Sequence, residues 1–257
     1  MKKSILAFAL GLVATGAFAA QPLQTRTETV ADFTEVHASA GVRVLYTQGP
    51  LTPAVIQAPA DILPYISVKV SGGKLTATID HLDNKVRNRK LDGLKIQISS
   101  PRIEDLDASS GAVLEAVTDI KSNELDVEAS SGALIKVPNA SVGEMTVDVS
   151  SGALVEIASA TTNDFEVDAS SGASVQVGTL NTKKAEFEVS SAGIVKLAGT
   201  TNSMKIEASS GAVFNGSKFK AKNAVVKTSS GAQVDISAVT ASIDSPKFGG
   251  GQVKNHN

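Results

Sequence analysis

Apolar and polar residues alternate with a period of two along most of this chain, which is the pattern of a β-strand with one buried face. One alternating run leads into each Ser-Ser-Gly sequence, and a second run follows it. Apolar positions of the first kind include Leu125/Val127/Ala129 and Met145/Val147/Val149, and those of the second kind include Ile135/Val137 and Val155/Ile157. No segment after the first twenty residues keeps a 3.6-residue period. The pattern therefore predicts an all-β protein.

The same short phrase recurs along the chain at nearly constant spacing. Ala-Ser-Ser-Gly-Ala, or a near variant, occurs seven times, with its first serine at positions 109, 130, 150, 170, 190, 209 and 229. The steps between them are 21, 20, 20, 20, 19 and 20 residues. A fixed period of this length is the signature of a repeat architecture. Each unit is expected to be a strand, a Ser-Ser-Gly corner, a second strand and a loop.

Two architectures fit such a unit. In a β-solenoid each unit is one coil, and equivalent residues stack about 4.8 Å apart. In an antiparallel meander the units are joined by hairpins, which favour Asn-Gly, Asp-Gly or glycine-first turns. The repeated Ser-Ser-Gly is none of these, and a solenoid needs the same small residues at every corner, so the sequence favours a solenoid with about 20 residues per coil.

The chain divides into four segments. Residues 1–20 have the layout of a secretory signal peptide, with Lys2 and Lys3, an apolar stretch from Ile5 to Val13 and an Ala17–Ala19 cleavage motif. That stretch is too short to span a membrane. Residues 21–100 form an irregular part of the solenoid, in which 38–42 and 70–74 resemble degenerate corners. Residues 101–240 form the regular repeat, and 241–257 form a C-terminal cap and tail.

Several short patterns resemble the head GIN domain family, which is described as auto-transporter adhesins. They are Asp32–Val36, Gly41–Val44, Gln48-Gly49, Ile62–Ile66, Gly73–Leu75, the Ser-Ser-Gly-Ala repeats and Ser245-Pro246. The resemblance spans roughly residues 30–250. It implies a secreted right-handed parallel β-helix with no established catalytic residues.

Composition argues against several classes of function. The chain has no cysteine and only three histidines, His37, His81 and His256, so it lacks the usual groups for a catalytic or zinc site. A net charge of −2 gives no general attraction to nucleic acid. No later apolar run is long enough for membrane insertion. The protein is therefore expected not to be an enzyme.

One outward position carries an acid in nearly every repeat, two residues before the first corner serine. These residues are Asp107, Glu128, Asp148, Asp168, Glu188 and Glu207, and Lys227 follows them. Stacked at coil spacing, each like-charge pair should cost a few tenths to about 1 kcal/mol. They are the candidate ligand-binding residues, as a track for a cationic ligand or for weak Ca²⁺ binding. The alternative is a solvated face that keeps the protein soluble. No other metal or cofactor is expected.

The leading functional hypothesis is an exported, adhesin-like binding protein in the periplasm or at the cell surface. Its partners would be a polysaccharide or an envelope or surface protein. The alternative is a structural envelope protein that acts through self-association, and a polysaccharide-active enzyme is a minor third reading that rests on fold analogy.

Overall fold

The computed structural model describes residues 22–80, 91–245 and 249–256, so the expected signal peptide lies outside the described residues. Nearly all of the described chain is β-structure, with one short 3₁₀ helix, η1 (Leu63–Tyr65). The strands are β1 (Leu23–Glu28), β2 (Glu35–Ala38), β3 (Arg43–Gln48), β4 (Thr52–Pro59), β5 (Ile66–Ser71), β6 (Lys74–Ile79), β7 (Lys95–Ser100), β8 (Asp105–Ala108), β9 (Val113–Ala116), β10 (Ile120–Ala129), β11 (Leu134–Val149), β12 (Leu154–Thr161), β13 (Asp164–Ala169), β14 (Ser174–Val189), β15 (Ile194–Ala208), β16 (Val213–Thr228), β17 (Gln233–Asp244) and β18 (Gln252–Asn255). Among the described residues, no helix is long and apolar enough to cross a membrane.

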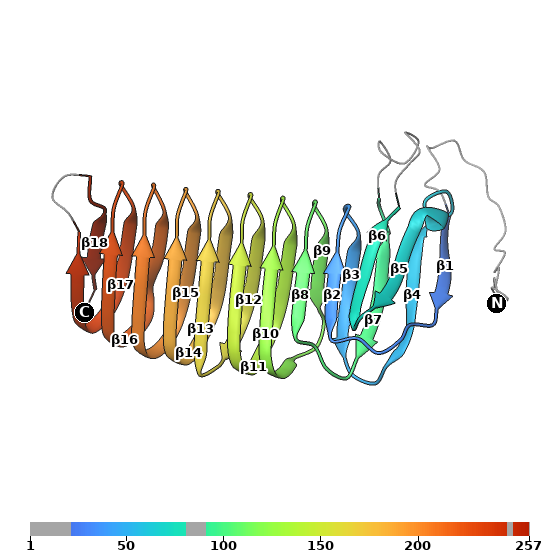
Figure 1. The fold of residues 1–257 in the computed structure, drawn as a ribbon, viewed down its shortest axis with the longest axis horizontal. Helices are drawn as coiled ribbons and strands as arrows, with labels where there is room; N and C mark the ends of the chain where they lie inside the picture. Colours follow the sequence, from blue (N-terminus) through green and yellow to red (C-terminus); the bar gives the residue numbers. More distant parts are fainter. Residues whose placement is uncertain (1–21, 81–90, 246–248, 257) are drawn as a thin grey trace, which may run out of the picture.

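The strands wind into a flattened solenoid whose coils stand side by side along the long axis of the molecule (Figure 1). Segments that lead into the corners, such as β8 and β13, form a first layer. Segments that leave the corners, such as β9 and β12, form a second layer. Successive coils pair in parallel and in register, so that Val127 lies beside Val147, and Val147 beside Val167. The predicted parallel solenoid with about twenty residues per coil is confirmed.

The core lies between the two layers and consists of the predicted inward positions. Val147 is completely buried, and its neighbours Val127 and Val167 are buried as well. Farther along, Phe187 packs against the rings of Phe165 and Phe214, with centroid distances of 6.1 and 4.8 Å. Burial of the inward side chains of every coil is the main stabilising term here, because the chain has no disulfides.

The corners have a backbone conformation that the sequence did not suggest. The second serine and the glycine both have positive φ, for example 52° at Ser110 and 72° at Gly111, and Ala112 N donates to Ser109 O at 3.0 Å. These are the features of a type I′ turn, which usually closes a hairpin. Here β8 pairs with β2 and β10, while β9 pairs with β3 and β11. The turn therefore links the two layers of one coil rather than two neighbouring strands.

A backbone ladder ties the corners of successive coils together. Gly111 N donates to Ser131 O at 3.1 Å, and Gly132 N donates to Ser151 O at 3.1 Å. In the described part of the chain, the corner hydroxyls from residue 109 onward make no side-chain hydrogen bonds, so backbone groups rather than hydroxyls link successive corners. The serines with positive φ, such as Ser110 and Ser131, are exposed to solvent.

In several coils the side opposite the corners is a bend within one continuous strand, rather than the loop expected from the sequence, whereas short breaks separate β9 from β10 and β12 from β13. β11, β14 and β16 each run for 16 residues through it. Threonine hydroxyls hold several bends: Thr162 Oγ1 lies 2.9 Å from Gly143 O and 2.8 Å from Asp164 O. Because one coil donates to the carbonyl of the coil before it, the bend stays in register.

The N-terminal part combines one true corner with antiparallel strands. Residues 39–42 form a corner, with positive φ at Ala40 and Gly41. The expected corner at 70–74 is wrong, because Gly72 and Gly73 close an antiparallel hairpin in which Val70 pairs with Leu75. β4 also runs antiparallel to β1 and β7. These strands add to the N-terminal end of the solenoid, where Figure 1 shows them.

Candidate functional site

The six predicted carboxylates stack on the outer face of the first layer. Glu128 pairs in register with Asp107 and with Asp148, and the series continues without a shift through Asp168, Glu188 and Glu207. We call these six residues the acidic ladder. Neighbouring members belong to adjacent coils, which are about 4.8 Å apart. The predicted stacking of these residues is thus confirmed, although their role in binding stays a prediction.

Among the described residues, basic side chains lie against only the two ends of the acidic ladder. At the N-terminal end, Asp107 Oδ2 lies 2.6 Å from His37 Nδ1 and 3.8 Å from Lys74 Nζ. At the C-terminal end, Glu207 Oε1 lies 3.3 Å from Lys205 Nζ and 3.4 Å from Lys227 Nζ. The four central members, Glu128, Asp148, Asp168 and Glu188, are exposed and form no ion pair within the described chain.

The pKa values of a central and a terminal ladder residue are shifted in opposite directions. Partial desolvation of its carboxyl, reinforced by the charges of Asp168 and Glu128, raises the pKa of Asp148 above its usual value. Hydrogen bonds from Lys205 and Lys227 lower the pKa of the Glu207 carboxyl. The ionised carboxylate of Asp148, in the centre of the ladder, is therefore destabilised, whereas that of Glu207 at the C-terminal end is stabilised.

Two further rows of acids lie beside the ladder, and sequence reasoning missed them. The row two residues earlier contains Glu35, Asp105, Asp126, Glu166 and Glu186. The row beyond it contains Glu124, Glu144 and Asp164, which also pair in register. The outward parity of these positions could have revealed them, but they are less regular in the repeat. In the coils of β10, β11 and β13 the outer face of the first layer is therefore acidic across its width, whereas Lys184 and Lys205 continue these two rows in the later coils.

A second missed feature is the crowding around Asp105 near the N-terminal end. Its Oδ2 lies 3.6 Å from Lys74 Nζ, while its Oδ1 is buried without a hydrogen-bond partner. Burial raises the pKa of Asp105 to about 6, against the opposing attraction of Lys74 and with help from the charge of Asp107. The ionised form of Asp105, which lies beside the ladder, is thus destabilised by its surroundings.

The ladder and the corner serines together line two shallow troughs. Glu128, Asp148 and Asp168 lie with the corner residues Ser130 and Ser150 along a hollow of about 330 Å³. A second hollow of about 390 Å³ contains Glu188, Glu207 and Lys227. Across the described ranges, no three His, Asp or Glu side chains converge on a point that could hold a metal ion. The troughs present extended negative charge and hydroxyls rather than a chelating centre.

Solved structures of low sequence identity share this fold. An adhesin-like protein from Parabacteroides merdae, described as a "putative adhesin", superposes with a TM-score of 0.75 at 17% identity, covering 91% of this chain and 96% of its own. A protein of the same description from Parabacteroides distasonis gives 0.73 at 17% identity over 91% and 97%. One from Bacteroides fragilis gives 0.64 at 18% identity over 92% and 98%. At these identities the likeness shows the fold alone.

The family assignment rests on a match that covers most of the chain. No curated protein matches the sequence. The family model described as "Putative auto-transporter adhesin, head GIN domain" matches residues 32–193 and again 160–257, which confirms the resemblance found in the sequence. The chain therefore belongs to the head GIN domain family.

Proposed function

We propose that this chain is an exported, non-catalytic binding protein of the adhesin type, which attaches to a cationic partner through the acidic ladder. The observation that carries the proposal is the set of four exposed carboxylates held in register without neutralising cations. Membership in an adhesin family supports the binding role. The signal-peptide pattern of residues 1–20 supports export.

The second layer of the same molecule argues against solubility as the whole explanation. There, Glu115, Lys136 and Glu156 alternate in sign over three adjacent coils, and Lys136 Nζ lies 2.7 Å from Glu156 Oε2. Alternating signs also keep a face hydrated, and they avoid the repulsion between stacked acids. Four adjacent carboxylates without neutralising cations are better suited to a partner of opposite charge.

The binding role is tested with a triple variant, Glu128→Gln, Asp148→Asn and Asp168→Asn. The matched control removes three carboxylates from the second layer, with Glu115→Gln, Glu156→Gln and Asp235→Asn. Calorimetric titration with a lysine oligopeptide at low salt should show binding by the parent chain and the control, and loss of binding by the triple variant. Equal loss in both variants would mean that only net charge matters, and the proposal would be wrong.

Display on the cell is tested by protease treatment of intact cells. Removal of the mature chain, while a periplasmic marker protein survives, is the result expected for a surface adhesin. Protection until the outer envelope is opened would place the binding surface inside the envelope and remove the adhesin role.

A specific observation also supports the second candidate, self-association. β18 pairs only with Gln233–Ile236 of β17, so the rest of β17 has no strand on its outer side among the described residues. Ile243 pairs with the buried Val226 and yet is 47% exposed, and Val239 is 72% exposed. Open strand edges with apolar side chains promote pairing between chains. A molar mass that rises with concentration, and returns to the monomer value in Ile243→Lys, would support this role.

A further inference from the structure

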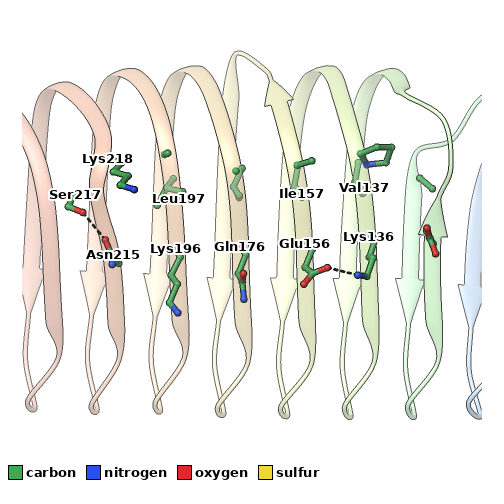
Figure 2. A pocket seen from close by; sticks show the side chains of 17 residues that line it. Lys136, Val137, Glu156, Ile157, Gln176, Lys196, Leu197, Asn215, Ser217 and Lys218 are labelled. Carbon is green, nitrogen blue, oxygen red and sulfur yellow. Dashed lines mark hydrogen bonds and ion pairs between the residues drawn. The ribbon is translucent and has the colours of Figure 1, made fainter.

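A long groove lies on the second layer, away from the acidic ladder (Figure 2). It has a volume of about 610 Å³ and crosses six coils, from β9 to β16. At a coil spacing of about 4.8 Å, it spans roughly 24 Å along the solenoid. One wall is a row of outward polar side chains in register: Glu115, Lys136, Glu156, Gln176, Lys196 and Asn215.

Small residues make the floor of the groove. The outward positions next to the polar row are Pro138, Ala158, Gly178 and Ala198, none of which has a side chain long enough to fill the space. At Gly178 a Cβ atom would lie 2.5 Å from the carbonyl oxygen of Ala158, so the backbone geometry there permits only glycine. The hollow is therefore built into the packing of adjacent coils.

A β-bulge shapes the C-terminal end of the groove. Between β15 and β16, Lys196 pairs with Asn215 but Ala198 pairs with Lys218, so β16 contains one extra residue at this point. The bulge brings Lys218 beside the floor residue Ala198 and adds Ser217 to the lining. Bulges commonly re-aim side chains next to functional sites.

The two halves of the groove differ in charge. In the first half the ionic groups neutralise one another: Glu115 Oε2 lies 2.8 Å from Arg43 Nη2, and Lys136 pairs with Glu156. In the second half, Lys196 and Lys218 are exposed and form no ion pair with any described residue. The other polar lining there consists of Gln176, Asn215 and Ser217, and it contains no acid. This half therefore carries two uncompensated positive charges on adjacent coils.

We propose that this groove binds a linear anionic glycan, such as a polymer of uronic acids, with its carboxylates at Lys196 and Lys218. The amides of Gln176 and Asn215 lie in the same half and supply both donors and acceptors for sugar hydroxyls. The length of the groove, roughly 24 Å, suits a linear polymer. This ligand is opposite in charge to the partner proposed for the acidic ladder, and the two faces bind independently.

An acidic peptide fits the groove less well. Peptides that bind β-proteins commonly add a strand to a free sheet edge, where main-chain hydrogen bonds provide affinity. The groove crosses the face of a layer in which β11, β12, β14 and β15 already pair with neighbours on both sides. A peptide would contact side chains alone, whereas a glycan presents its hydroxyls and carboxylates directly to them.

The test is titration calorimetry of the mature chain with an oligogalacturonate long enough to span the groove. The double variant Lys196→Gln and Lys218→Gln should raise the Kd by roughly tenfold or more, because two charge-assisted contacts are lost. Lys254→Gln removes an exposed lysine that lies outside the groove lining, and it should leave the Kd unchanged. Ala158→Leu fills the floor without changing the charge and should also weaken binding.

Three outcomes would overturn the proposal. The first is no binding of the oligogalacturonate by the parent chain at low salt. The second is equal weakening by Lys254→Gln, which would mean that only net charge is sensed. The third is tighter binding of polyglutamate than of the oligogalacturonate, which would assign the groove to acidic peptides. All of the variants alter exposed side chains, so an unchanged thermal midpoint excludes misfolding as the cause. If the lysine oligopeptide does not bind to the acidic ladder, the proposed function fails, but the result of this groove experiment is unaffected.

Discussion

The buried carboxyl of Asp105 makes a quantitative prediction: Asp105→Asn should stabilise the protein at neutral and alkaline pH. Asp105 pairs in register with Glu35 on one side and Asp126 on the other, so its charge adds to an acidic row. Its side chain is only 21% exposed, and its Oδ1 has no partner. Asparagine has nearly the same size, removes the charge and can donate a hydrogen bond to a neighbouring carboxylate.

The magnitude follows from the pKa of Asp105, which burial raises from 3.8 to about 6. At about 1.4 kcal/mol for each pH unit between the two values, the ionised side chain destabilises the native state by at most about 3 kcal/mol. Solvent screening reduces this to about 1–2 kcal/mol. Because the native state holds the Asp105 proton more tightly than the unfolded chain, stability falls as pH rises from 3.8 to above 6. The gain in Asp105→Asn should therefore be full at pH 8 and absent below pH 4.

The assay is urea denaturation of the parent chain and Asp105→Asn at pH 4, 5, 6, 7 and 8. The difference in unfolding free energy should grow with pH through the interval between 3.8 and about 6 and then level off. The His37–Asp107 pair is present in both proteins, so its contribution to stability largely cancels from the difference. Asp92→Asn, which neutralises an exposed carboxylate in a turn, serves as the control and should show no such trend. A difference that is constant with pH, or a destabilised Asp105→Asn at pH 8, would refute the reasoning.

Three further predictions concern the core, the corners and the ladder. Val147→Asp should lower the unfolding free energy by several kcal/mol because it buries an unpaired charge. Thr146→Asp places a carboxylate outward between Asp126 and Glu166, so it should lower the unfolding free energy by about 1 kcal/mol at low salt and by little at high salt. Urea titrations of both variants test these values. Ala192 has φ 62° at the corner position that Gly172 occupies in the preceding coil, so Ala192→Gly should raise the unfolding free energy by about 1 kcal/mol. Gly172→Ala should lower it by a similar amount in the same assay. Thermal midpoints should rise with NaCl, which screens the ladder, and should be equal in Ca²⁺ and in EDTA at matched ionic strength; a rise specific to Ca²⁺ would mean that the troughs coordinate the ion.

The regular part of the fold was predictable because one local pattern is repeated and each repeat has the same parity. The alternation at Met145, Val147 and Val149 places these residues in the core whichever way the coils connect. The spacing of the corner serines then predicts that Asp148 stacks between Glu128 and Asp168, as it does. Both results depend only on positions within one repeat, so the sequence contains all that is needed.

The remaining features depend on which strands become neighbours, and alternation alone does not determine that. Residues 66–71 alternate as the coils do, yet the glycine pair after them turns the chain into a hairpin, so β5 runs antiparallel to β6. The hollow on the second layer depends on Pro138, Ala158 and Gly178 coming side by side from different coils. Lys218 reaches that hollow only because β16 gains a residue relative to β15. Each of these is a relation between distant parts of the chain.

The charge pattern separates the two layers because a solenoid turns each repeat position into a row on one face. Asp148 and Glu156 are only eight residues apart, yet one lies in an acidic row on the first layer and the other in a row of mixed sign on the second. Along the ladder, Lys74 and His37 at one end and Lys205 and Lys227 at the other confine the uncompensated charge to the central coils. Those coils are also the ones with a fully paired ladder and a continuous buried core, so they can sustain the repulsion without unwinding at an end. A protein that needed only solubility would spread its carboxylates evenly. The unneutralised carboxylates lie instead on the central coils, whose strands are paired on both sides, and this favours a surface that binds a partner in a fixed geometry.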